Sequence, residues 1–123
     1  MRCTRERAIE LLNETFRTGQ SNMTFSTGET GQAVTCRLPE RVSERDARNG
    51  CRLIARSLRE LSEVPENEGD APVNFRSDHY PHGPTQERWD IFPSSDEDCV
   101  PVCHVSYWRH PNGQRQAIIN IWG

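Results

Sequence analysis

The segment from 44 to 62 constrains the fold more than any other part of the chain. Its apolar residues recur at helical spacing along one side. Ser43 followed by Asp46 resembles a capping box, and Val42 with Ala47 can form a hydrophobic staple. The apolar side consists of Ala47, Cys51, Ile54, Ala55, Leu58 and Leu61. The sequence therefore predicts one long amphipathic helix, which must bury this side against another layer.

Shorter elements precede this helix. Residues 4–17 also carry apolar residues at helical spacing, with Thr4 as the expected cap and Gly19 as the expected stop. The stretches 23–27 and 32–36 alternate apolar and polar residues, and a glycine-bounded turn joins them. This pattern predicts a helix followed by a β-hairpin.

Short strands are expected after the long helix. Val73 and Phe75 alternate with polar neighbours, as do Trp89 and Ile91. In 102–109 the alternation places one set of side chains on each face: Cys103, Val105 and Tyr107 on one, and His104, Ser106 and Trp108 on the other.

The final hairpin is signalled by its turn. Asn112-Gly113 supplies the positive φ that a tight turn needs, and 116–122 returns as the last strand. The complete order predicts an α+β fold, with one main helix packed on a twisted antiparallel sheet. An N-terminal hairpin and an extra N-terminal helix complete a single domain spanning 1–123, in which 1–21 is a helical extension.

The length and charge of the chain exclude several classes of protein. A chain of 123 residues can bury one core but not two. No stretch approaches the roughly 20 apolar residues of a bilayer span, so we expect no membrane partner. A net charge of −3 argues against tight non-specific binding of nucleic acid. We expect a monomer without a cofactor.

Cysteine usage indicates an oxidising compartment. Five cysteines in so small a chain predict disulfides and a secreted protein. Cys51 lies on the apolar side of the long helix and is expected to be a buried free thiol. Cys36 could pair with Cys99 or Cys103, and Cys3 with the other. The Cys-x3-Cys-His run at 99–104 lacks a second pair of ligands, so no metal site is expected. The polar first residues contain no signal peptide, which favours a mature chain with an added Met1 over a cytosolic protein.

Several short strings resemble a known family. The "YPH" at 80–82 resembles the Tyr-x-His strand of the small guanyl-preferring fungal ribonucleases, whose element order the chain follows from residue 22. A closer resemblance is to the ribonuclease-like secreted effectors of powdery mildew fungi. It rests on "TCRLPERVSERDA" (35–47), "RWDIFPSSDED" (88–98) and the final hairpin. The resemblance covers residues 30–122, implies a microbial-ribonuclease-like fold, and gives the helix at 4–17 no counterpart.

The resemblance implies an incomplete catalytic set. In such enzymes a Glu acts as base, a His on the last strand as acid, and an Arg stabilises the phosphorane. In this chain the expected Glu falls at or near Ile91, the Arg near Ser106, and the last His near Ile121 or Trp122. The candidates that remain if the chain is active are Tyr80, His82, Glu87, Asp90, His104 and Arg109.

We therefore expect a secreted fungal virulence effector on a catalytically deficient ribonuclease-like scaffold, acting within host cells if it is delivered there. Its expected partners are host RNA or ribosomal components, host proteins, or a plant immune receptor. Trp108 and Trp122 are the candidate binding residues, since exposed aromatic rings stack on bases or fill protein interfaces. The alternatives are an active secreted guanyl-preferring ribonuclease and a small cytosolic inhibitor protein of a phage or bacterium.

Overall fold

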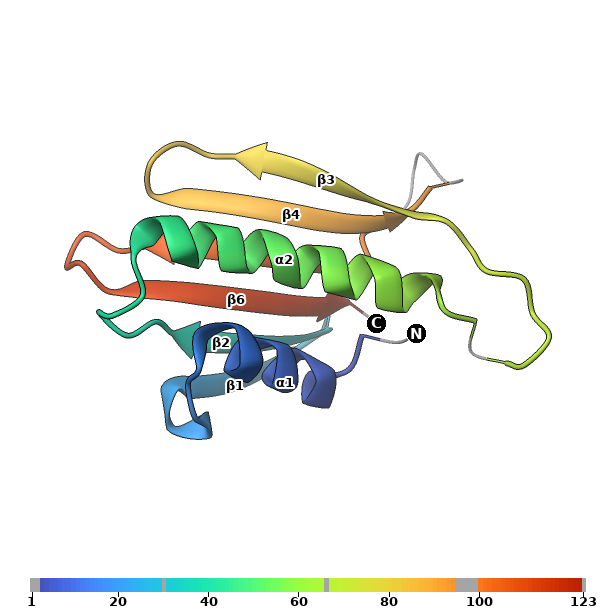
Figure 1. Ribbon diagram of the computed structural model, residues 1–123, viewed down its shortest axis with the longest axis horizontal. Helices are drawn as coiled ribbons and strands as arrows, with labels where there is room; N and C mark the ends of the chain where they lie inside the picture. Colours follow the sequence, from blue (N-terminus) through green and yellow to red (C-terminus); the bar gives the residue numbers. More distant parts are fainter. Residues whose placement is uncertain (1–2, 30, 66, 95–99, 123) are drawn as a thin grey trace.

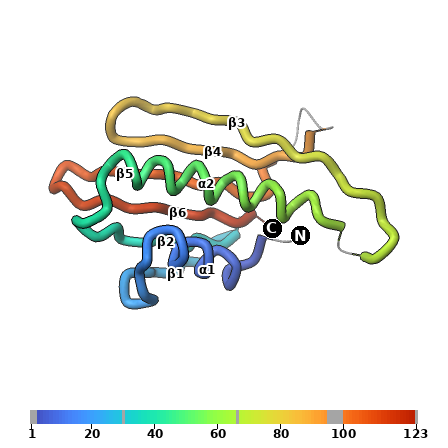
Figure 2. The backbone as a smooth tube through the Cα atoms, in the orientation of Figure 1, coloured from blue at the N-terminus to red at the C-terminus, as the bar shows by residue number. Residues whose placement is uncertain are grey.

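Two helices cover one face of a single antiparallel sheet. The computed structural model describes residues 3–29, 31–65, 67–94 and 100–122. The elements are α1 (Arg5–Phe16), the 3-10 helix η1 (Gln20–Asn22), β1 (Met23–Gly28), β2 (Gly31–Arg37), α2 (Glu44–Glu63), β3 (Phe75–Pro81), β4 (Gln86–Pro93), β5 (Cys103–Arg109) and β6 (Arg115–Trp122). The six strands follow the order β1-β2-β6-β5-β4-β3, and both helices lie on the same side of them (Figures 1 and 2). The expected α+β class is confirmed.

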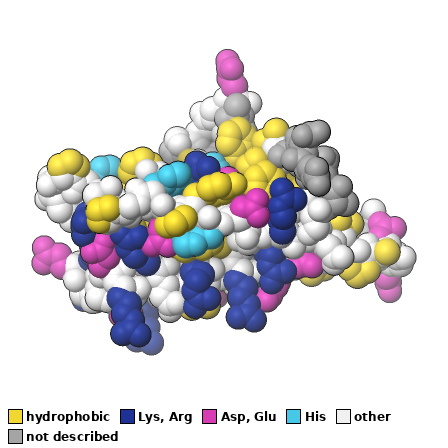
Figure 3. Space-filling view, turned by 90° about the horizontal axis from the view of Figure 1, so that it is seen from above, with side chains coloured by type: hydrophobic (Ala, Val, Ile, Leu, Met, Phe, Trp, Pro, Cys, Tyr) yellow, Lys and Arg dark blue, Asp and Glu magenta, His cyan; other side chains and the backbone are white. Residues whose placement is uncertain are grey.

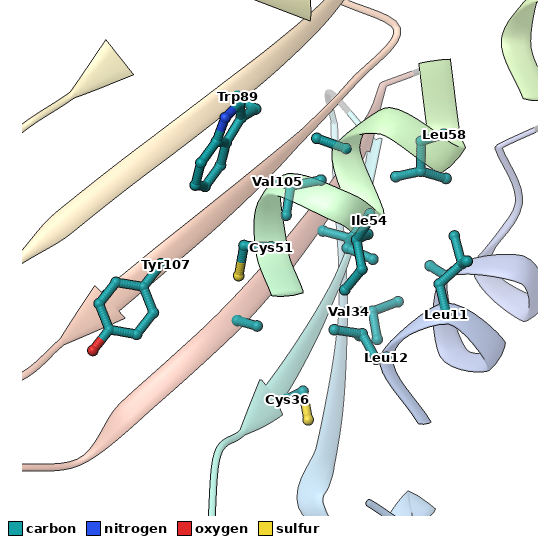
Figure 4. Close-up of a cluster of buried hydrophobic side chains, with 14 of the residues drawn as sticks. Leu11, Leu12, Val34, Cys36, Cys51, Ile54, Leu58, Trp89, Val105 and Tyr107 are labelled. Atoms are coloured by element: carbon teal, nitrogen blue, oxygen red, sulfur yellow. The ribbon is translucent and has the colours of Figure 1, made fainter. Parts of the chain in front are cut away.

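Helix α2 is the central element of the helix layer. The Ser43 side chain accepts a hydrogen bond from the Asp46 N–H at 3.1 Å, so the expected cap is present. The predicted apolar side is buried, with Ala47, Cys51, Ile54, Ala55 and Leu58 against the sheet. In Figure 4, buried side chains of α2 such as Ile54 lie between side chains of α1, such as Leu12, and side chains of the strands, such as Val105. The sequence pattern therefore identified both the helix and its buried face.

Helix α1 ends earlier than expected. It begins after the Thr4 cap and ends at Phe16, and Arg17 adopts a left-handed conformation with φ 53°. The Arg17 N–H donates to the Asn13 carbonyl at 2.7 Å. Arg41, distant in sequence, donates to the carbonyls of Phe16 at 2.7 Å and of Arg17 at 2.6 Å. This long-range cap satisfies the last turn, so Gly19 is not the stop.

The last two strands pair as the turn signal predicts. Gly113 has φ 88°, and its N–H donates to the His110 carbonyl at 2.9 Å. The resulting register sets His104 opposite Asn120. At the other margin of the sheet, β3 is the edge strand and carries Tyr80, with His82 just after it. Within the described ranges, no helix is long and apolar enough to cross a membrane.

The expected disulfides are not formed among the described cysteines. Cys3, Cys36, Cys51 and Cys103 are free, buried thiols, and Cys99 lies outside the described residues. Cys36 cannot reach Cys103, because β6 lies between their strands and the register offsets them by four residues. That separation is about 16 Å, far beyond a disulfide's span. Cys51 is buried and free, as the sequence predicts.

Candidate functional site

The sheet face opposite the helices is the candidate functional site. Because side chains alternate along a strand, the residues that do not face the helices point outward together. We call this surface the open face and define it by its outward side chains on β3 to β6. They include Tyr80, Arg88, Asp90, His104, Trp108, Asn120 and Trp122. None of the described helices lies over it (Figure 1).

A buried carboxylate lies at the centre of the open face. Asp90 is only 6% exposed although it points away from the helix layer. Arg88 Nε lies 2.9 Å from Asp90 Oδ1 as an ion pair. The two groups lack the alignment of a hydrogen bond, and neither atom has a hydrogen-bond partner among the described residues. Buried polar atoms normally find hydrogen-bond partners, whereas these two atoms are held by their mutual ion pair.

His104 lies beside this pair in a defined tautomer. The indole N–H of Trp122 can only donate, and it lies 3.2 Å from His104 Nδ1, so Nδ1 must accept. The ring proton is therefore on Nε2, which lies 2.8 Å from the Asn120 side-chain amide. The structure places the amide nitrogen of Asn120 there; since Nε2–H and the amide N–H would both donate, the amide must be turned so that its oxygen accepts.

The surroundings of His104 favour its neutral form. Burial lowers the pKa of His104, and the neighbouring Arg88 adds to this effect, while the Asp90 carboxylate opposes it. Nδ1 and Asp90 Oδ1 are 4.0 Å apart, too far for a hydrogen bond. His104 thus acts at neutral pH as an uncharged donor and acceptor that positions its neighbours.

Aromatic rings surround the buried polar pair. The guanidinium of Arg88 lies over the Tyr80 ring at 4.9 Å, and Tyr80 stacks near His82 with ring centres 6.2 Å apart. Trp108 is 36% exposed at the end of β5. Trp122 covers the other side of His104, with ring centres 5.9 Å apart. Figure 3, seen from above, shows hydrophobic and histidine side chains interspersed with arginines along the margin where β3 lies.

The structure separates the residues that the sequence nominated for catalysis. Tyr80, Asp90 and His104 share the open face, whereas Glu87 and Arg109 point to the helix layer.

The two nominated histidines are also far apart. The His82 N–H donates to the Gln86 carbonyl, which places His82 level with Trp108. His104 is four residues further along β5 and two strands away from β3. Strand geometry then separates the backbones of His82 and His104 by about 16 Å. The imidazole rings of His82 and His104 therefore do not lie close enough together to act on the same phosphate.

Glu87 and Arg109 attach α2 to the sheet. Glu87 forms ion pairs with Arg48 of α2 and with His79, the latter at 2.7 Å. Arg109 Nη1 lies 2.6 Å from Glu44 Oε2 at the start of α2. Burial alone would raise the pKa of Glu87, but hydrogen bonds from Arg48 and His79 outweigh it, and the pKa lies below its ordinary value. These contacts stabilise the fold.

We expect Glu87 to contribute to acid sensitivity. Its folded-state pKa is lower than its unfolded-state pKa, so its stabilisation is fully present above the ordinary value of 4.5. The free energy of unfolding should then fall as the pH drops from that value through the folded-state pKa. Urea unfolding between pH 6 and about pH 3 should show a flatter acid limb in Glu87→Gln. Glu60→Gln, which changes an exposed pair with Arg56, is the control and should keep the slope. Equal slopes in all three proteins would contradict this assignment.

Sequence reasoning missed two members of the open face. Arg88 was not nominated, although it stands two residues before Asp90 and therefore shares its face. Asn120 was not nominated either, although the register of the final hairpin sets it opposite His104. Both signals were present in the strand alternation and the turn position. To nominate Arg88 and Asn120 from these signals, one must also assume that the site lies on the outward face of the sheet and not on the face that contacts the helices.

Neither a search for metal-binding clusters among the described residues nor comparison with known proteins assigns a role to the open face. Among the described ranges, no three His, Cys, Asp or Glu side chains gather to hold a metal ion. Cys99, part of the Cys-x3-Cys-His run, lies outside them. No protein-family model, curated protein or solved structure matches this chain.

Proposed function

We propose that the open face binds single-stranded RNA without cleaving it. The observation that carries the proposal is the buried pair of Asp90 and Arg88, whose Oδ1 and Nε atoms lack hydrogen-bond partners among the described residues. A nucleobase edge offers neighbouring donors and acceptors, which is the chemistry such a pair can satisfy. A base that reaches the pair, after the side chains over it move, would add two hydrogen bonds to groups that now have only their mutual ion pair.

The aromatic side chains around the pair suit splayed bases. Single-stranded RNA is recognised largely by stacking on aromatic and arginine planes, because its bases are not paired. Tyr80 with Arg88 on its ring offers one such plane, and the exposed Trp108 offers another. The net charge of −3 is consistent with this mode, since stacking and base-edge contacts need no strongly basic field.

Binding without cleavage follows from the placement of the proton-transfer groups. Transesterification needs a base and an acid on either side of one phosphate. His82 and His104 lie two strands apart in the sheet and are offset by four residues along the strands. Glu87 and Arg109 are engaged by α2. Asp90 and His104 remain, and they lie on the same side of any ligand.

The biological setting of the proposal comes from the family resemblance. We propose a ribonuclease-like scaffold that has lost catalysis, secreted by a fungus as a virulence effector and available to plant immune receptors. The long helix α2 across the β3-β4-β5-β6 meander, with Tyr80 on its edge strand, supports the scaffold. The RNA-binding face is the part of this proposal that can be tested with the purified chain.

Fluorescence anisotropy with labelled single-stranded RNA oligomers tests the function. Wild type should bind, and Trp108→Ala should weaken binding by roughly 5- to 100-fold, since one base stack contributes about 1–3 kcal/mol. Leu53→Ala is the matched control, because Leu53 is 41% exposed on α2, on the other side of the sheet. No binding by wild type, or equal losses in both variants, would refute the proposal. A parallel cleavage assay that finds turnover above background would instead favour the active ribonuclease.

A further inference from the structure

Two buried thiols meet where the start of the chain packs on the sheet. Cys3 immediately precedes the Thr4 cap of α1 and is 2% exposed, and Cys103 begins β5 and is fully buried. Cys3 lines the same recess as Ile121, which lies directly opposite Cys103 in the β5-β6 register, and the two thiols are in contact there. Figure 1 shows the beginning of the chain beside the end of β6, the strand that pairs with β5.

The other described cysteines have different surroundings. The Cys36 thiol lies 3.5 Å from the Thr18 hydroxyl, with which it shares a hydrogen bond. Cys51 is held on the buried side of α2, among apolar side chains (Figure 4). Cys3 and Cys103 are the described pair whose thiols are in contact, although 100 residues of chain separate them.

We propose that Cys3 and Cys103 form a covalent cross-link when the protein meets a low-molecular-weight disulfide such as oxidised glutathione. In the first step one protein thiolate attacks the small disulfide, which forms a mixed disulfide and releases one small thiol. In the second step the other protein thiolate displaces the second small thiol and closes the protein disulfide. Two protein thiols are oxidised, one small disulfide is reduced, and the two protein protons end on the two released thiols.

Cys3 is the thiol that can begin the exchange. It lies just before α1 and outside the sheet, so local opening of the segment that leads into α1 exposes it without unfolding the sheet. Cys103 lies in the core, and its hydrogen bond with Cys3, together with burial, raises the pKa of Cys103 above its ordinary value. Since the thiolate is the reactive form, exchange in the folded protein is slow and proceeds through opening of the N-terminal segment.

The cross-link would attach α1 to the sheet at a second point. Closing a loop of about 100 residues restricts the unfolded chain strongly. For a domain of this size the expected increase in Tm is roughly 10–20 °C.

Peptide mapping of wild-type protein after incubation with oxidised glutathione tests the proposal. We expect the loss of two free thiols, a mass decrease of about 2 Da for the two hydrogens removed, and a bond that fragmentation assigns to Cys3 and Cys103. Five remaining thiols, or a bond from either residue to Cys36 or Cys99, would overturn it. Five free thiols would also favour the cytosolic inhibitor over a secreted protein.

Thermal unfolding provides an independent readout. Oxidation should raise the Tm of wild type and of Cys51→Ala, which retains the pair, but not that of Cys3→Ser. If Cys3→Ser gains the same Tm increase, the cross-link is not responsible for it and the proposal fails. Peptide mapping of the wild type decides the matter if Cys51→Ala does not fold. RNA binding plays no part in either readout, so this inference and the proposed function can fail separately.

Discussion

Tyr107→Ala is expected to lower the free energy of unfolding by about 3–5 kcal/mol, because it empties a large site in the core. Tyr107 is fully buried in β5, where it contacts Glu44 and Arg48 at the start of α2. The guanidinium of Arg48 lies 4.8 Å from the ring centre, and the hydroxyl lies 3.4 Å from Glu44. The ring therefore supports the ion pairs that attach α2 as well as the apolar core. Guanidinium chloride denaturation followed by circular dichroism measures the change.

Tyr107→Phe is the matched control for this effect. It retains the ring and removes the hydroxyl, with its long hydrogen bond to Glu44 and its contact with Arg115, so the loss should be about 0.5–1.5 kcal/mol. If the two variants lose equal stability, the hydroxyl and not the ring is the important group. If Tyr107→Ala is within about 1 kcal/mol of wild type, the packing of α2 on β5 described above is wrong.

Asp90→Asn is expected to weaken RNA binding by roughly 10- to 100-fold, the value of a hydrogen bond to a charged group. The carboxylate Oδ1 accepts a donor from a base edge, whereas an amide turned the other way presents a donor there and carries no charge to hold Arg88. Stability should change little, within about 1 kcal/mol, because the amide has nearly the same shape and the Arg88 contact is not an aligned hydrogen bond. Anisotropy titration and urea unfolding of the same preparation measure both quantities.

Two comparisons make the Asp90→Asn result decisive. Asp78→Asn is the matched control, since Asp78 is more exposed on the same face and already pairs with Arg76 at 3.3 Å. It should bind RNA nearly as wild type does. If Asp90→Asn binds as well as wild type while remaining folded, the buried carboxylate is not part of the site. A large loss of stability without a separate loss of binding would make Asp90 a structural residue.

Local patterns in the sequence predicted the helices and strands, because the formation of each helix or strand depends mainly on residues that are close in the sequence. The buried side of α2 follows from apolar residues three and four positions apart. The pairing of β5 with β6 follows from Asn112-Gly113, since a tight turn sets the register of both strands. The same register determined that His104 faces Asn120. The stop of α1 was missed because its cap, Arg41, is distant in sequence.

The sequence by itself determined which side chains share a strand face, because alternation and helical spacing are properties of the local backbone. Only the tertiary structure decided that β2 pairs with β6 and that both helices cover the same side. Those choices depend on burying every apolar surface at once, among residues far apart in the chain. They leave Asp90 Oδ1 and Arg88 Nε on the outward face without hydrogen-bond partners among the described residues, and they bring Cys3 to Cys103.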